Sequence, residues 1–283
     1  MDEVNASPGA GPQLYRPRPA LANHIEFFGY WERAAGDPHR SRALPRGAAT
    51  VIIDVSGRHR VDFYAGDGRT RLHVPPAFIA GAGTESYITR IDAEQAVMTV
   101  HFRPAGALPF LGIPLGDLEN ACVGLEQLWG VQGQSLHERL IEAEAVADRI
   151  EILEAFLLHR AEVHDVGRHR GVAAALRAFE ENPSLRVSRA GELSGLSPKR
   201  LAAAFRAEVG LAPKAYQRVR RLQAALSRLD AGPTSGASIA ADLGYFDQAH
   251  FVREFTAFTA ISPTQYAQRR SSLPSHVDVL ATT

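Results

Sequence analysis

Hydrophobic positions change their period along this 283-residue chain, from alternation up to about residue 103 to helical spacing after about residue 118. Short runs rich in β-branched and aromatic side chains, separated by Gly, Pro, Asp and Ser, are typical of strands joined by turns. They lie at 27–31, 49–55, 60–64, 69–74, 78–82, 86–91 and 96–102. Their regular spacing predicts an antiparallel β-sandwich or β-barrel at the start of an α+β chain.

Two helices are predicted next, at 135–145 and 148–162, with Ser135 and Asp148 as their N-caps. Apolar residues lie at helical spacing on both: Leu136, Leu140, Ile150, Leu153, Leu157 and Leu158. An apolar face of this kind either packs against the strands of the same chain or joins a second copy, and the pattern leaves both interpretations open. A homodimer is therefore one option.

Two helix-turn-helix patterns follow, at about 187–208 and 238–258. Ser197 is placed to cap the second helix of the first pattern, and Asp247 that of the second. The helix predicted between them, at 213–229, would be a rod of roughly 25 Å at 1.5 Å per residue. Such a rod can hold two recognition helices about one turn of B-DNA apart, roughly 34 Å.

The charge balance differs between the two parts of the chain. Of 31 basic and 31 acidic residues in all, residues 166–270 hold sixteen Lys and Arg against eight Asp and Glu. This excess predicts that the C-terminal part meets a polyanion and that the remainder does not. Apolar runs too short to cross a bilayer, an N-terminus unlike a signal peptide and a single cysteine, Cys122, predict a cytoplasmic protein.

A set of motif residues in the second helix-turn-helix stands in register without a gap. They are Ile239, Ala240, Leu243, Gly244, Tyr245, Asp247, Gln248, Ala249, His250, Phe251, Arg253, Phe255, Ile261, Ser262, Pro263 and Tyr266. The run resembles the signature of the AraC/XylS family of bacterial transcription regulators. Upstream, the same pattern is matched by Leu201, Phe205, Gly210, Pro213, Tyr216, Arg221, Leu222 and Ala225.

The resemblance implies a division of the chain into functional domains. Residues 1–13 would be a disordered lead, 14–165 a cupin-like sensor and dimerisation domain, 166–270 the DNA-binding domain and 271–283 a polar tail. It further implies double-stranded DNA and RNA polymerase as partners, a small-molecule effector, no cofactor and no enzymatic activity. The motif FRPAGALPFLGIP, from Phe102, is similar to one subgroup of these regulators.

The candidate DNA-binding residues lie on the polar faces of the two predicted recognition helices: Lys199, Arg200, Arg206, Gln248, His250 and Arg253. Arginine can donate two hydrogen bonds to guanine O6 and N7, and glutamine suits adenine N6 and N7. Arg206 and Arg221 could serve phosphates, although Arg221 could instead be an internal structural arginine.

The sequence departs from the family pattern in three ways. Ala203 stands where relatives often carry a long polar side chain, and Thr256 and Ala257 stand where a basic pair is common. Gly191 replaces the usual alanine and weakens its helix by roughly 1 kcal/mol. These departures predict modest affinity and keep open a sensor module with degenerate DNA binding.

A small barrel or sandwich can enclose one small ligand. Candidate lining residues are Pro45, Ile53, Tyr64, Phe78, Tyr87 and His101, and ordinary sheet core is the alternative for each.

Histidines on predicted strands raise the question of a metal. His59, His73 and His101 show no His-x-His pair followed by Glu, so the ligand spacing expected for zinc or iron is missing and no metal is predicted. This also argues against a cupin-like dioxygenase or isomerase fused to a helical module. A DNA-repair fusion with a reactive cysteine is disfavoured because Cys122 lacks the sequence context of such domains.

Overall fold

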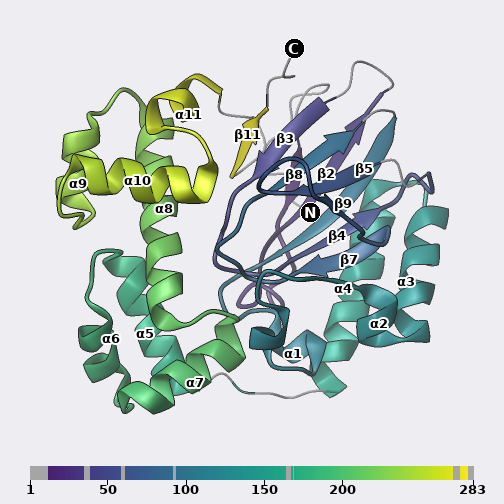
Figure 1. Cartoon of the computed structure of the whole chain (residues 1–283). Helices are drawn as coiled ribbons and strands as arrows, with labels where there is room; N and C mark the ends of the chain where they lie inside the picture. Colours follow the sequence, from purple (N-terminus) through teal and green to yellow (C-terminus); the bar gives the residue numbers. More distant parts are fainter. Residues whose placement is uncertain are drawn as a thin grey trace.

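The structure is a computed structural model that describes residues 12–34, 39–58, 61–91, 94–163, 167, 169–269 and 275–279. Figure 1 shows a β-rich N-terminal part on the right and a helical part on the left, with one long helix running between the two groups of helices on the left. The lead predicted for residues 1–13 lies outside the described residues, except for its last two.

Two antiparallel sheets form the N-terminal part. The six-stranded sheet has the order β1 (Gln13–Tyr15), β2 (Ile25–Arg33), β9 (Gln95–Phe102), β4 (Thr50–Asp54), β7 (Ala77–Ala80), β10 (Cys122–Gly124). The five-stranded sheet has the order β11 (His276–Asp278), β3 (His39–Ala43), β8 (Tyr87–Ile91), β5 (Val61–Ala65), β6 (Arg71–Leu72). The sheets face each other as an open sandwich, so of the two predicted forms the sandwich is confirmed and no barrel closes.

One face of the six-stranded sheet carries the N-terminal core. Residues such as Phe28, Val51, Met98 and Val100 pack there against the helices that follow the strands. These are α1 (Leu108–Leu111), the 3₁₀ helix η1 (Leu115–Leu118), α2 (Leu125–Trp129), α3 (Val131–Glu142) and α4 (Val146–Val163).

The apolar faces of α3 and α4 belong to this same core, which decides between the two interpretations of their pattern. Leu136, Leu140, Ile150, Leu153 and Leu157 are each at most 2% exposed and pack within the chain. The surface of these five side chains is therefore not free for a second copy, and Leu158, the sixth residue of the predicted set, is half-buried.

The predicted caps of these two helices are wrong. The two helices begin earlier, at Val131 and Val146, so Ser135 and Asp148 lie inside them. Gly130, at φ +58°, turns the chain directly from α2 into α3, and this early start was not visible in the apolar spacing.

The helical part contains seven helices within the described residues: α5 (Arg170–Glu181), α6 (Val187–Ser194), α7 (Pro198–Val209), α8 (Pro213–Ala231), α9 (Gly236–Asp242), α10 (Gln248–Thr259) and α11 (Pro263–Arg269). Both predicted recognition-helix caps are confirmed: Ser197 Oγ accepts from the Arg200 amide (3.4 Å) and Asp247 Oδ1 from the His250 amide (2.6 Å). Gly244, at φ +69°, makes the turn between α9 and α10 in a conformation that favours glycine. The helices α6–α7 and α9–α10 thus form two helix-turn-helix units joined by α8.

The chain returns to the N-terminal part after α11, where a polar tail was predicted. Strand β11 pairs antiparallel with β3, so that Val277 lies opposite Arg42, and Val277 is buried at 2% exposure. Such a short strand has no sequence signal of its own, because its order comes from the partner strand and from one buried side chain. Of the rest of the predicted tail, only Ser275 and Val279 lie within the described ranges.

Candidate nucleic-acid interface and ligand cavity

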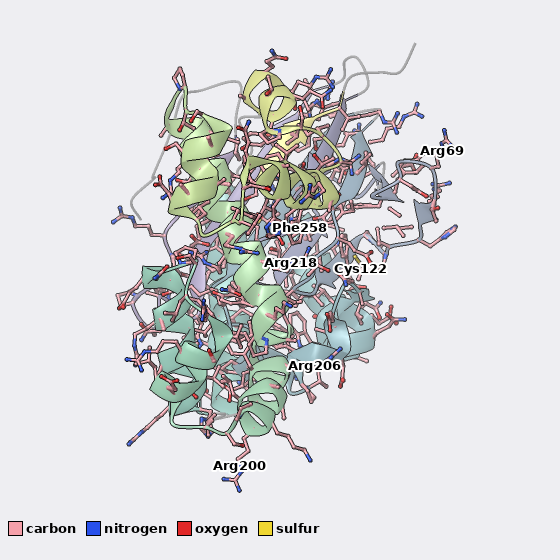
Figure 2. All side chains as sticks on the ribbon, turned by 60° about the vertical axis from the view of Figure 1, so that its left-hand side comes forward. Arg69, Cys122, Arg200, Arg206, Arg218 and Phe258 are labelled. Carbon is pink, nitrogen blue, oxygen red and sulfur yellow. The ribbon has the colours of Figure 1, made fainter. Side chains whose placement is uncertain are left out.

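The polar face of α7 starts at its N-terminal turn. Lys199 and Arg200 are exposed there, and Arg200 projects away from the rest of the molecule in Figure 2. Behind them Leu201 and Phe205 are buried, with Phe205 edge-on to Phe179 of α5 and Tyr216 of α8. The buried side fixes the rotation of α7, so Lys199 and Arg200 are free to meet a ligand.

Arg206, one turn further along, has a partner in the N-terminal part. Its Nη2 forms an ion pair with Glu119 Oε2 at 2.6 Å. η1 lies close beneath it: a Cβ added at Gly116 would be 2.8 Å from Arg206 Cγ and 3.1 Å from the Arg206 carbonyl oxygen. The end of the first recognition helix is therefore packed against the β-rich part.

On α10, Gln248 and Arg253 are exposed, whereas His250 is half-buried. The ring of His250 packs edge-on against Tyr245 at 5.4 Å, and its Nδ1 accepts a hydrogen bond from the Phe246 amide (3.3 Å). These contacts let His250 hold the turn before α10. Phe246 itself is 92% exposed at that turn.

The sequence did not predict a buried carboxylate on the inner face of α10. Glu254 accepts hydrogen bonds from Arg221 (2.8 Å) and Arg218 (2.9 Å) of α8, and Arg221 lies over the ring of Tyr245 at 4.6 Å. Burial, followed by the nearby Glu254 charge, raises the pKa of Tyr245. Of the two predicted roles of Arg221, the structure fits the internal structural one. The sequence did hold a signal for the buried carboxylate, because Glu254 is an acidic residue beside Phe251 and Phe255 on the apolar side of its helix.

A cavity of about 290 Å³ lies between the two sheets. Its lining comes from alternate residues of each strand, for example Thr50 and Ile52 of β4 and Thr99 and His101 of β9. This face of the six-stranded sheet is opposite to the one that carries the helices. The sandwich is thus packed on one side of that sheet and hollow on the other.

Four of the six predicted lining residues line this cavity, namely Pro45, Phe78, Tyr87 and His101. Ile53 and Tyr64 do not. Ile53 alternates with the lining residues Ile52 and Asp54 and therefore points into the helix-covered core, where it is fully buried. Tyr64 alternates in the same way with Phe63 and contacts Arg40 on the outer side.

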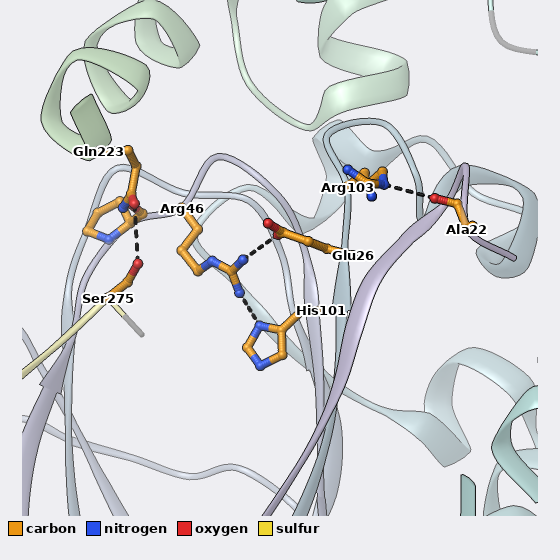
Figure 3. A network of polar contacts seen from close by, with 8 residues as sticks. Ala22, Glu26, Arg46, His101, Arg103, Gln223 and Ser275 are labelled. Carbon is orange, nitrogen blue, oxygen red and sulfur yellow. Dashed lines mark hydrogen bonds and ion pairs between the residues drawn. The ribbon is translucent and has the colours of Figure 1, made fainter. Parts of the chain in front are cut away.

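Arg46 and His101 form a polar end of the cavity, seen in Figure 3. Arg46 Nη2 donates to Glu26 Oε2 (2.6 Å) and its Nη1 donates to His101 Nδ1, while the His101 ring stacks on Phe27 at 4.3 Å. Burial, and then the charge of Arg46, lowers the pKa of His101 well below its usual value. His101 is therefore a neutral acceptor in this structure.

This end of the cavity is bonded to the long helix α8. Gln223 of α8 donates from Nε2 to the Pro45 carbonyl oxygen (2.6 Å) and accepts from Ser275 Oγ (3.2 Å), as Figure 3 shows for Ser275. Gly47, at φ +75°, lets the neighbouring loop approach α8: a Cβ there would be 3.1 Å from the Tyr216 ring.

Residues 192–269 match a family of helix-turn-helix domains, and residues 13–124 match a domain family of unknown function, DUF6597. The first match spans the turn-and-recognition-helix units at both ends of α8. The chain carries an AraC-type helix-turn-helix domain. No curated protein matches the chain.

Several solved structures resemble this chain. ToxT from Vibrio cholerae is 10% identical over 85% of this chain and 97% of its own, with a TM-score of 0.46. A ToxT structure bound to an unsaturated fatty acid is 9% identical over 85% of this chain and 94% of its own, with a TM-score of 0.46. The C-terminal domain of AraT, a response regulator from Geobacillus stearothermophilus, is 22% identical over 36% of this chain and 88% of its own, with a TM-score of 0.34.

The described residues also bear on two other functions, membrane insertion and metal binding. In this part of the chain, none of the helices has the length and apolarity needed to span a bilayer. Among the same residues, no three His, Cys, Asp or Glu side chains group as metal ligands would; His73 is exposed, and His59 lies outside the described ranges.

Proposed function

We propose that this AraC-type protein is a transcription regulator that places α7 and α10 in adjacent major grooves and responds to a small ligand held between its two sheets. The observation that carries the proposal is the pair of helix-turn-helix units at the two ends of α8. At 19 residues, α8 is a rod of roughly 28 Å. This length suits recognition helices that reach grooves about 34 Å apart.

The residues proposed to touch bases are Lys199 and Arg200 from α7 and Gln248 and Arg253 from α10. His250 is bonded within the turn through Nδ1, so its Nε2 is the atom left for DNA. Arg206 is proposed to contact a DNA phosphate, and its ion pair with Glu119 would break when it does so. Such a regulator would act in the cytoplasm, without enzymatic activity, and would contact RNA polymerase; a homodimer would need a surface other than the buried faces of α3 and α4.

The coupling of ligand to DNA is proposed to run through Gln223. This side chain joins the cavity rim at Pro45 to α8, the helix that sets the separation of the recognition helices. A ligand that displaces Arg46 or Pro45 would therefore bias the placement of α8. The relation is reciprocal, because a ligand that changes DNA affinity must itself bind with changed affinity when DNA is present.

Selection of binding sites from random DNA by the full-length protein, followed by gel-shift titration, tests this function. We expect an enriched site with two recognition elements about 10 base pairs apart, matching one helical turn. Affinity should fall steeply between about 50 and 200 mM salt, because cations of the helical part displace counterions from phosphates. An unenriched pool, or binding indifferent to salt, would refute the proposal.

A further inference from the structure

The cavity has a second polar end, away from Arg46. Asp54 closes β4 and Gln95 opens β9, and both line the cavity. Asp54 lies opposite Val97 in the paired strands, and Gln95 is two residues from Val97 on the same face. Diagonal neighbours of this kind lie roughly 7–8 Å apart. One small chemical group can therefore touch both side chains.

Both side chains are buried, and both carry polar atoms without a hydrogen-bond partner among the described residues. Gln95 is 1% exposed and Asp54 is 5% exposed. Asp54 Oδ1 accepts from the amide and the hydroxyl of Ser56, at 2.8 and 2.5 Å. Within the described ranges, however, neither Asp54 Oδ2 nor either amide atom of Gln95 has a hydrogen-bond partner. Native proteins keep few such atoms, because each has lost its bonds to water without replacement.

The wall around these two residues is apolar. Trp31 lies opposite Val97 from the neighbouring strand β2, and Val61 and Ile91 form a cross-strand pair in the facing sheet. Small-molecule sites typically have an apolar wall and a small number of polar groups that point to the same place. The volume of about 290 Å³ is roughly twice that of an engineered cavity known to hold a benzene ring.

We propose that Asp54 and Gln95 are the subsite that recognises a hydrogen-bond donor, a hydroxyl or an ammonium group, on a small ligand with an apolar, ring-sized body. An ionised carboxylate can only accept, so Asp54 Oδ2 requires a donor. Gln95 can donate to a hydroxyl oxygen or accept from an ammonium. A ligand carboxylate has no donor to offer and meets the charge of Asp54. The inference rests on the proposed ligand regulation and adds the chemical class of the ligand.

Four probes that share a butylphenyl group distinguish these chemistries: 4-butylphenol, 4-butylbenzylammonium, 4-butylbenzoate and butylbenzene. Calorimetric titration of the full-length protein should show at least one of the two donors binding about tenfold or more tightly than butylbenzene and the benzoate, as expected for a hydrogen bond to a charged group. Asp54→Asn keeps the Oδ1 acceptor for Ser56 but turns the free acceptor into a donor. It should therefore reverse the order of phenol and benzoate.

Gln95→Met supplies a readout that needs no ligand. The substitution keeps the volume and removes two unpartnered polar atoms, so it should raise the Tm of the free protein by about 2–4 °C while lowering donor affinity. Gln134→Met, the same change on the exposed face of α3, is the matched control and should alter neither quantity.

Equal affinity of the four probes, or no binding of any, would overturn the subsite. A Gln95→Met variant with an unchanged or lowered Tm would overturn it as well, because the amide would then have partners. Gel-shift titration of the same preparations measures DNA binding separately. If the probes contradict the subsite while the protein still binds its selected DNA, the ligand proposal alone is wrong. If the protein does not bind DNA, the proposed function itself is wrong.

Discussion

Arg206 on the first recognition helix is held by Glu119 of the β-rich part, with 2.6 Å between Nη2 and Oε2. Arg206 is also our proposed phosphate contact, so Glu119 and DNA would compete for one guanidinium group. The close approach of Gly116 to the Arg206 backbone fixes this arrangement. The position of the N-terminal part therefore bears on how much of α7 is available to DNA.

Glu119→Gln should release Arg206 and strengthen DNA binding. The pair is partly exposed, with side-chain exposures of 59% for Arg206 and 24% for Glu119, so its strength is at most about 1 kcal/mol and the gain in affinity at most about fivefold. The salt dependence is the sharper measurement. One added phosphate contact makes the slope of log affinity against log salt steeper by about 0.9.

Glu126→Gln serves as the control for that experiment. Glu126 is an exposed acid on α2, and its removal changes the net charge by the same amount. If both variants shift affinity equally, the effect comes from net charge and the competition for Arg206 is refuted.

Arg253→Ala should weaken specific DNA binding by about 1–3 kcal/mol and relax the base preference at one position of the site. The side chain is exposed on α10, and no ion pair of Arg253 occurs among the described residues. Gel shifts over a library of single-base variants of the selected site would measure the preference. Arg69→Ala, an exposed arginine in the β5–β6 turn, is the matched control and should leave the preference unchanged; an unaltered preference in Arg253→Ala removes that residue from the reading set.

Gly47→Ala should separate the cavity rim from α8. A Cβ at this position would lie 3.1 Å from the Tyr216 ring, so the loop must withdraw, and the positive φ adds about 1–2 kcal/mol of strain. Gly57→Ala is a close control, since Gly57 also has a positive φ but a Cβ there meets only Ile141, at an ordinary 3.7 Å. Both variants should lower the free energy of unfolding, measured by urea titration, and the loss should be larger for Gly47→Ala. Equal losses would contradict a close contact between the Gly47 loop and Tyr216 of α8.

The helix-turn-helix units were predictable because their signals are local. Ser197 and Asp247 are N-cap residues that predict where helices begin, and Gly244 predicts a turn. The apolar spacing predicts which helix faces are buried. The cavity lining was harder, because alternation shows two faces of a strand without showing which face is hollow. Ile53 and Tyr64 were candidates with sheet core as the alternative, and both lie on the face away from the cavity, since neighbouring residues of a strand point to opposite faces.

Contacts between distant segments were not predictable. The pairing of β11 with β3 and the ion pair of Arg206 with Glu119 join residues far apart in sequence, and neither has a local pattern. Gln95 did have a signal: it continues the alternation of Val97, Thr99 and His101 by one residue. Its burial depends on the facing sheet, which the alternation does not describe.

His101 should make the protein less stable as the pH falls. Its pKa in the folded state lies well below the usual value of about 6.5, because of burial and the neighbouring charges of Arg46 and then His276. Below about pH 6.5 the unfolded chain therefore binds a proton that the folded chain does not. The free energy of unfolding then decreases with falling pH, by up to about 1.4 kcal/mol per pH unit.

His101→Gln keeps an acceptor for Arg46 but cannot take up a proton. Urea titrations at pH 7 and pH 5 should show a smaller loss of stability in this variant than in the unaltered protein. His73→Gln removes an exposed histidine and should retain the full loss. If His101→Gln loses as much stability as the unaltered protein, His101 is already protonated in the fold, and the neutral acceptor beside Arg46 is ruled out.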